Sequence, residues 1–232
     1  MDISELKVVY EDNHIIVVVK PQNIPTQEDE SKDKDMLTIV KEYIKEKENK
    51  PGNVFVGLVH RLDRPTGGVM VFAKTSKAAS RLATQMADGV FKKKYLAVVL
   101  GKPREKRSRL IHFLKKNART NTVQVVPELT TDAKRAELEY NILDDREKVS
   151  LVEVDLFTGR SHQIRVQMKH IGCPIYGDVK YGGDKLAKGH NLALWAYELK
   201  IQHPTTKENM TFKVYPPEDK TPWNVFNLDI LK

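Results

Sequence analysis

The 232-residue chain has very little cysteine, and this scarcity excludes several kinds of site. Cys173 is the only cysteine. An internal disulfide and a cysteine-rich zinc site are therefore both excluded. The zinc deaminase signature, which combines His-x-Glu with Cys-x-x-Cys, is excluded for the same reason. The sequence also contains no Walker loop, no dinucleotide-binding glycine fingerprint and no HExxH helix.

Long apolar runs are missing as well. The longest covers residues 15–19, whereas a helix that spans a bilayer needs about 20 apolar residues. The first residues, MDISE, contain no basic segment followed by an apolar run, so no signal peptide is predicted. Together with the single cysteine, this pattern predicts a reducing, cytoplasmic compartment.

Positive charge exceeds negative charge in a composition that is otherwise ordinary for a globular protein. The chain has 39 Lys and Arg against 31 Asp and Glu, a formal net charge of +8. Such an excess favours a polyanionic partner, although a basic soluble protein is an equally good reading of the charge alone. Residues 102–119 carry eight cations and one acid, Glu105. A localised basic patch indicates a nucleic-acid contact, and the alternative is a solvated charged hairpin.

Predicted strands outnumber predicted helices. The strands are expected at residues 6–10, 14–20, 55–59, 69–74, 95–100, 122–126, 133–142, 148–157, 192–202 and 210–215. Helices are expected at residues 36–48 after an Asp35 cap, and between a Ser76 cap and Gly89, which ends that helix. Further helices are expected at residues 161–171 and briefly after Thr221-Pro222. Many strands are spaced like hairpins, which predicts an α+β fold with a mixed, largely antiparallel central sheet flanked by helices and loops. No flexible linker is visible, so we expect a single domain over residues 1–232, which could consist of two lobes.

A glycine-rich connection at residues 60–68 reads HRLDRPTGG. Its Asp63 lies between Arg61 and Arg64, and neighbouring cations stabilise an ionised carboxylate. At neutral pH such a carboxylate can act as a nucleophile or a general base. The residues alone support equally well a structural aspartate that caps the turn and pairs with Arg61 or Arg64.

Two further segments could carry chemistry. Residues 158–165, TGRSHQIR, lie at the start of a predicted helix, where free N–H groups favour anions. His162, Arg165 and Lys169 fall on the polar side of that helix, and from there Arg165 could pair with a carboxylate elsewhere in the chain. The alternative is a purely structural helix start.

The other segment, KKKYLA at residues 92–97, places three lysines beside Tyr95. This arrangement suits phosphate contact and base stacking. A solvated strand end with a packed tyrosine is the alternative.

Taken together and in order, these segments resemble the RluA-type pseudouridine synthases, which convert uridine to pseudouridine in ribosomal or transfer RNA. The resemblance covers most of the chain. It is carried by Lys20-Pro21, HRLDRPT at 60–66, KYLA at 94–97, GRSHQIR at 159–165, GCPIYGD at 172–178, Tyr181-Gly182 and His203-Pro204. It implies the pseudouridine synthase catalytic fold, and we expect no separate N-terminal RNA-binding module.

The resemblance implies three catalytic residues. Asp63 would be the essential aspartate, which either attacks the ribose C1′ or takes the C2′ proton to give a glycal. Tyr95 would pack on the target base and could assist proton removal from C5. Arg165 would orient Asp63 through an ion pair.

It also implies residues that bind the substrate. Arg61 would enter the RNA stack where the target uridine leaves, and Ile164 would line the base pocket. Further RNA contacts are expected at Arg64, Thr66, Arg160 and His162.

The implied reaction breaks a C–N bond, turns the uracil and forms a C–C bond. Nothing enters or leaves, so the resemblance implies no cofactor and no metal. The expected partner is ribosomal or transfer RNA, with no membrane and with the protein as a monomer. Gly67 and Trp195 depart from the Ser and His that are common in the family, and we expect them to alter the fit to RNA without abolishing activity.

Two other functions compete with this one. An RNA-binding or ribosome-assembly factor could use the same fold without its chemistry, but it would not need Asp63, Tyr95 and Arg165 together. A metal-free hydrolase could use Asp63 and His162, but the sequence offers no clear second carboxylate or nucleophile.

Overall fold

The computed structural model describes residues 2–49, 51–182 and 189–231. The chain divides into two compact units, and each unit is built from two separate segments. The first unit comprises Met1–Lys92 and Ala196–Val214, and the second comprises Lys93–Trp195 and Tyr215–Lys232. The single catalytic domain expected over residues 1–232 stays a prediction.

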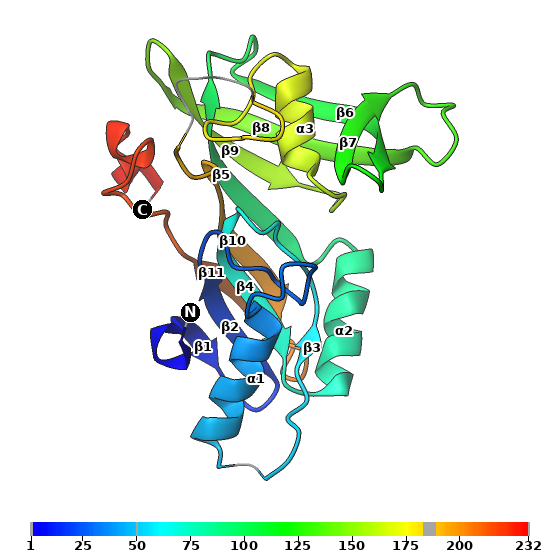
Figure 1. Ribbon diagram of the computed structural model, residues 1–232, viewed down its shortest axis with the longest axis vertical. Coiled ribbons are helices and arrows are strands. Elements are labelled where there is room, and N and C mark those ends of the chain that lie inside the picture. Colours follow the sequence, from blue (N-terminus) through cyan, green and yellow to red (C-terminus); the bar gives the residue numbers. More distant parts are fainter. Residues whose placement is uncertain (1, 50, 183–188, 232) are drawn as a thin grey trace. The chain divides into compact units, whose positions relative to one another are not determined.

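The first unit is organised around a sheet with the strand order β1-β2-β4-β10. These strands are β1 (Val8–Glu11), β2 (Ile15–Lys20), β4 (Gly67–Ala73) and β10 (Leu194–Gln202), which begins in the second unit; β3 (Gly57–Leu58) pairs with β4, and β11 (Asn209–Lys213) pairs with β10. Every residue of β2 and β4 is buried, so both faces of these two strands are covered. Figure 1 shows α1 (Met36–Lys47) and α2 (Ser76–Ala87) alongside this sheet.

Side-chain caps determine where both helices begin. The Asp35 carboxylate accepts a hydrogen bond from the Thr38 N–H at 3.1 Å and starts α1, as predicted. The predicted cap of α2 is wrong by one residue. Thr75, in extended backbone, caps this helix because its hydroxyl accepts the Ala78 N–H at 3.1 Å. The apolar faces of both helices then pack into the core of the unit.

The second unit contains an antiparallel sheet in the order β5-β9-β8-β6-β7. Its strands are β5 (Lys92–Leu100), β6 (Arg107–Asn117), β7 (Thr122–Val126), β8 (Lys134–Asp145) and β9 (Val149–Leu156). Helix α3 (Gln163–His170) lies across one face of this sheet (Figure 1). A core cluster between them consists of Leu114, Val123, Ala136, Val166 and Tyr181. Strand β6 is not among the strands expected from the sequence, where residues 102–119 suggest either a basic patch or a solvated charged hairpin.

The predicted fold class is confirmed: the protein is α+β, and its sheet is largely antiparallel. Short 3-10 helices occur at Ile3–Glu5, Trp223–Val225 and Leu228–Leu231, and the second of these is the short helix expected after Thr221-Pro222. Within the described parts of the chain, no helix is long and apolar enough to cross a membrane.

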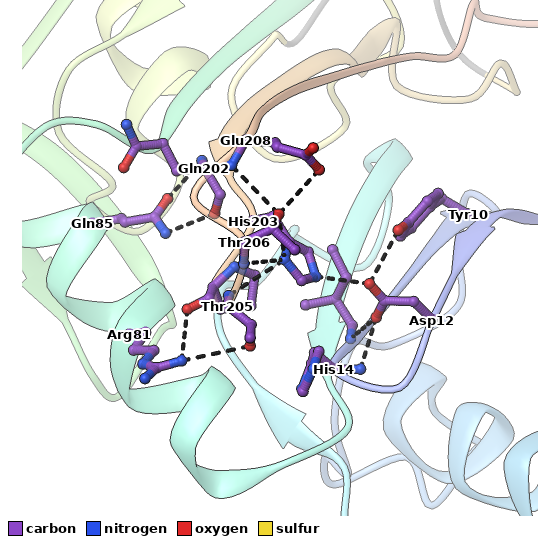
Figure 2. A network of polar contacts seen from close by, with 12 residues as sticks. Tyr10, Asp12, His14, Arg81, Gln85, Gln202, His203, Thr205, Thr206 and Glu208 are labelled. Carbon is purple, nitrogen blue, oxygen red and sulfur yellow. Dashed lines mark hydrogen bonds and ion pairs between the residues drawn. The ribbon is translucent and has the colours of Figure 1, made fainter.

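A polar network closes the first unit at the turn between β1 and β2 (Figure 2). The Asp12 carboxylate accepts hydrogen bonds from the backbone N–H groups of His14 at 2.7 Å and Ile15 at 2.8 Å. It also accepts a hydrogen bond from His203 Nε2 at 2.7 Å. His203 Nδ1 accepts the Thr206 N–H at 2.9 Å, so Nε2 is the nitrogen that carries the ring proton. The turn after β1 is thereby tied to the turn before β11.

Candidate active site

Asp63 stands at the start of a tight turn in the first unit. The Thr66 N–H donates to the Asp63 carbonyl at 2.9 Å and closes the turn. The buried ammonium of Lys20 donates to the carbonyl oxygens of Pro21 at 2.9 Å, Arg64 at 2.9 Å and Thr66 at 2.8 Å. Lys20, the last residue of β2, therefore fixes the backbone that follows Asp63. The Asp63 side chain is half-buried.

The position of Lys20 has an electrostatic consequence. Burial lowers the pKa of the Lys20 ammonium to about 7, and the negative charge of Asp63 opposes that shift. Three carbonyl acceptors match the three N–H donors of an ammonium, whereas a neutral amine has only two. Lys20 was read from the sequence as a strand end, and only the fold reveals it as the residue that supports the turn.

The backbone before Asp63 is held by Thr26. The Thr26 hydroxyl donates to the Leu62 carbonyl at 2.8 Å and accepts the Leu62 N–H at 3.3 Å. Leu62 itself is buried. The backbone is thus anchored on both sides of Asp63.

The arginines beside Asp63 differ in their surroundings. Arg61 is exposed, as an RNA-contacting side chain would need to be. Arg64 forms an ion pair with Asp33 and donates to the Ser31 hydroxyl at 2.7 Å. The hydrogen bond from Arg64 is the main reason that the pKa of the Asp33 carboxyl lies below its usual range. The RNA contact expected at Arg64 stays a prediction.

Close packing against strand β10 explains why residue 68, at the end of the glycine-rich connection, is glycine. Gly68 has φ +126°, and a Cβ at this position would lie 2.2 Å from the carbonyl oxygen of Ala196 on β10. Only glycine permits this approach of two strands. Thr66, expected to contact RNA, is only 2% exposed, and its hydroxyl has no hydrogen-bond partner within the described residues. That RNA contact also stays a prediction.

Tyr95 lies on β5 in the second unit, directly opposite Val154 on β9. It is 5% exposed. The neighbouring Lys94 points to the other face of the sheet, where its ammonium is 2.7 Å from Glu153 and 3.4 Å from Asp155. The charge of Lys94 is therefore neutralised within the unit. Lys94 is thus less suited to the phosphate contact that was suggested for Lys92, Lys93 and Lys94.

Arg165 is the centre of a buried polar cluster in the second unit. Its guanidinium donates from Nε to Oδ2 of Asp178 at 2.8 Å and from NH2 to Oδ1 at 2.7 Å. Arg165 is 6% exposed and Asp178 is 3% exposed. His162, Arg165 and Lys169 all contact Tyr181, which agrees with the expectation that they share one side of the helix. Arg165 is nevertheless buried there, because a charge with a bidentate partner can be buried.

Tyr181 joins Arg165 to His162. The guanidinium carbon of Arg165 lies 5.1 Å from the centre of the Tyr181 ring. The Tyr181 hydroxyl accepts the Val123 N–H at 2.8 Å and is 2.7 Å from His162 Nδ1. The hydroxyl proton can therefore go to Nδ1, leaving the ring proton of His162 on Nε2. Asp178 and Tyr181 had no role in the sequence analysis, although both lie in segments that carried the resemblance.

The loop before α3 is braced by Gln163. Its Oε1 accepts the Thr158 hydroxyl at 2.8 Å and the Arg160 N–H at 3.0 Å. Arg160 is exposed and donates from Nε to the Arg135 carbonyl at 3.0 Å. Ile164 is 4% exposed. The RNA contacts expected at Arg160, His162 and Ile164 stay predictions.

The predicted site residues thus form two constellations, one in each unit. Asp63, Arg61, Arg64 and Thr66 belong to the first, whereas Tyr95, Arg160, His162, Ile164 and Arg165 belong to the second. The Asp63–Arg165 ion pair would join residues of different units and stays a prediction. Across the residues that the structure describes, no three His, Cys, Asp or Glu side chains are grouped to hold a metal ion.

Comparisons with known proteins bear on the family. The family described as RNA pseudouridylate synthase matches residues 14–170. The chain is 33% identical over 219 residues to the "Uncharacterized RNA pseudouridine synthase YlyB" of Bacillus subtilis, covering 93% of this chain and 70% of that relative. It is also 33% identical over 230 residues to the "Ribosomal large subunit pseudouridine synthase D" of Pseudomonas aeruginosa, covering 93% and 69% of the two chains.

A solved structure shares the fold. "Human RNA Pseudouridylate Synthase Domain Containing 4" superposes with a TM-score of 0.77 at 21% identity, covering 97% of this chain and 92% of that one. The resemblance seen in the sequence is therefore confirmed. The chain belongs to the RNA pseudouridylate synthase family and is an isomerase that converts uridine in RNA to pseudouridine.

Proposed function

We propose that the chain modifies uridine in ribosomal RNA and that Asp63 is its catalytic carboxylate. The observation that carries this assignment is the anchoring of the turn: Lys20 and Thr26 hold the backbone on both sides of Asp63. The ammonium of Lys20 also interacts electrostatically with Asp63. A carboxylate on a turn whose backbone is fixed in this way suits attack at C1′ or removal of the C2′ proton. Relatives named for the large ribosomal subunit favour ribosomal RNA as the target.

The other predicted residues have complementary roles in this proposal. Tyr95 packs on the uracil and assists loss of the C5 proton after the new C–C bond forms. Arg165 orients Asp63, and Asp178 positions Arg165. Arg61 fills the place that the flipped uridine leaves, and Ile164 lines the base pocket. Arg64, Thr66, Arg160 and His162 contact the RNA around the target nucleotide.

The test follows from the chemistry at C5. A new bond to C5 displaces its hydrogen, so RNA labelled with tritium at C5 of uridine releases tritium to water when pseudouridine forms. We expect the protein to release tritium from unmodified 23S ribosomal RNA, and Asp63→Asn to abolish release while the Kd for the same RNA stays within about threefold. Asp219→Asn, at an exposed carboxylate, is the matched control and should remain active. Tritium release by Asp63→Asn would refute the role of Asp63.

We also infer that the protein acts as a monomer in the cytoplasm. A ribosomal RNA target places the enzyme where ribosomes are assembled, and a chain with one cysteine needs no oxidising compartment. Light scattering during size-exclusion chromatography should give a mass near 26.6 kDa. A mass twice as large would refute the monomer.

A further inference from the structure

The basic segment at residues 102–119 includes strand β6, and because side chains alternate along a strand, its cations lie on two opposite faces of the sheet. On β6, Arg107 and Arg109 point to the face where β8 supplies acids, and they form ion pairs with Glu139 and Glu137. Lys116, at an alternate position, belongs to the face that α3 covers, because it lies opposite the core residue Val123. The positive charge near Arg107 and Arg109 is therefore largely neutralised, whereas the charge at the end of the β6–β7 hairpin is not.

Four exposed cations lie at that end of the hairpin, at the end of α3 and in the loop that follows α3. They are Lys116, Arg119, Lys169 and Lys180, here called the hairpin track. Within the described residues, no carboxylate lies within ion-pair distance of any of the four. The sequence explains why, because residues 106–127 and residues 156–177 contain no Asp or Glu. The nearby Asp178 is already bound by Arg165.

The hairpin track is connected to the candidate active site through Tyr181. The ammonium of Lys169 lies 5.9 Å from the centre of the Tyr181 ring, on which the guanidinium of Arg165 also packs. The Lys180 ammonium donates to the Asn121 carbonyl in the hairpin turn at 2.9 Å. The Tyr181 hydroxyl binds Val123, the strand partner of Lys116. These contacts connect Lys116, Lys169 and Lys180 to Tyr181 and Arg165, and Arg119 lies in the hairpin turn that Lys180 contacts.

We propose that the hairpin track binds the phosphates of the RNA that adjoins the target uridine. This inference rests on the proposed function, because it takes Arg165 as part of the active site. Exposed lysines without carboxylate partners attract phosphates and release counterions from RNA on binding. Their charge is independent of base identity, so the track fixes the register of the RNA without selecting its sequence.

The experiment compares two charge-matched triple variants. Lys116→Gln/Arg119→Gln/Lys180→Gln removes three cations of the track, and Lys41→Gln/Lys45→Gln/Lys77→Gln removes three exposed cations from α1 and α2 in the first unit. Binding to a fluorescein-labelled RNA stem-loop is measured by anisotropy from 50 to 300 mM salt. Tritium release from 23S ribosomal RNA gives kcat and KM. A charge-preserving variant, Lys116→Arg/Arg119→Lys/Lys180→Arg, controls for folding.

For the track variant we expect the slope of log Kd against log salt to fall by about 2 to 3, because each lost phosphate contact removes about 0.7 to 0.9. Its KM should rise about tenfold or more, with kcat within about twofold. The first-unit variant and the charge-preserving variant should match the wild type. Equal losses in both Gln variants, or an unchanged slope in the track variant, would overturn the proposal. If the wild type releases no tritium, the proposed function fails, whereas the binding slopes still decide the track.

Discussion

Both oxygens of the Asp178 carboxylate bind one edge of the Arg165 guanidinium, with Oδ2 2.8 Å from Nε and Oδ1 2.7 Å from NH2. Oδ1 also accepts the N–H groups of Lys180 and Tyr181, each at 3.1 Å. A carboxylate with this many donors has its lone pairs satisfied, so the buried pair is well compensated. The direction of the Arg165 side chain is therefore set within the second unit.

Asp178→Asn should consequently destabilise the protein and slow the reaction. The substitution keeps the shape but leaves a buried guanidinium without its counter-charge, which costs about 3 to 5 kcal/mol of unfolding free energy. Urea denaturation measures this loss, and tritium release should show a lower kcat with little change in KM. Asp219→Asn, at a pair whose side chains are 73% and 70% exposed, should change stability by less than about 0.5 kcal/mol. Equal stability of the two variants would contradict the role of Asp178.

The buried Lys20 should give the protein an unusual dependence on pH. Its folded pKa of about 7 lies below the ordinary 10.5. Between these values the unfolded chain binds more protons than the folded chain, so the contribution of Lys20 to stability rises with pH, by at most about 1.4 kcal/mol per pH unit. Urea denaturation of wild type and Lys20→Met at pH 6, 7, 8 and 9 should show a difference in unfolding free energy that is flat below pH 6.5 and grows above it. Parallel curves would refute the low pKa.

Gly68→Ala should prevent normal folding of the first unit. The new Cβ would lie 2.2 Å from the Ala196 carbonyl oxygen, and φ is +126°. Gly52 is the matched control because its φ is also positive, at +90°, but no atom lies within 4 Å of a Cβ there. Gly52→Ala should cost only the backbone strain, about 1 to 2 kcal/mol. Thermal unfolding followed by circular dichroism separates the two outcomes, and similar melting temperatures would contradict the close approach.

Asp12→Asn should weaken the protein chiefly above pH 4. Although burial opposes it, hydrogen bonds from the Ile15 and His14 N–H groups hold the pKa of the Asp12 carboxyl below its usual value. A lowered folded pKa gives stability that is present above the unfolded pKa and is lost as pH falls through the folded one. The wild type should therefore lose more unfolding free energy than Asp12→Asn between pH 5 and pH 3. An equal loss in both proteins would exclude a stabilising role for the ionised carboxylate.

The sequence predicted most elements because their residues carry local signals. The β-branched run of β2 and the Asp35 cap of α1 are examples. Strand β6 was not predicted because its solvent-facing positions include Arg107 and Arg109. In the fold, Glu139 and Glu137 of β8 form ion pairs with these arginines and so compensate their charge within the sheet. Such a partner is 28 to 32 residues away in the chain, and no periodicity within β6 reveals it.

The candidate site shows the same division. The motif around Asp63 was visible, but its support was not, because Lys20 reaches the turn from 44 to 46 residues away. Arg165 was visible as a cation on a helix, but its burial depends on Asp178, which follows a turn at Gly177 where a Cβ would lie 2.2 Å from the Asn191 carbonyl oxygen. Local sequence can suggest which groups react, whereas the groups that hold them are brought by the fold.

The interleaving of the two units also sets an order of events during synthesis. The first unit needs Ala196–Val214 for β11 and most of β10, and the second needs Tyr215–Lys232. A ribosome that has translated only to Trp195 has therefore produced neither unit in full, and β4 still lacks most of its neighbouring strand β10. The exposed edge of the apolar strand β4 can associate with other chains until Ala196–Val214 emerge from the ribosome, so the need for chaperones should persist at least until that segment is made.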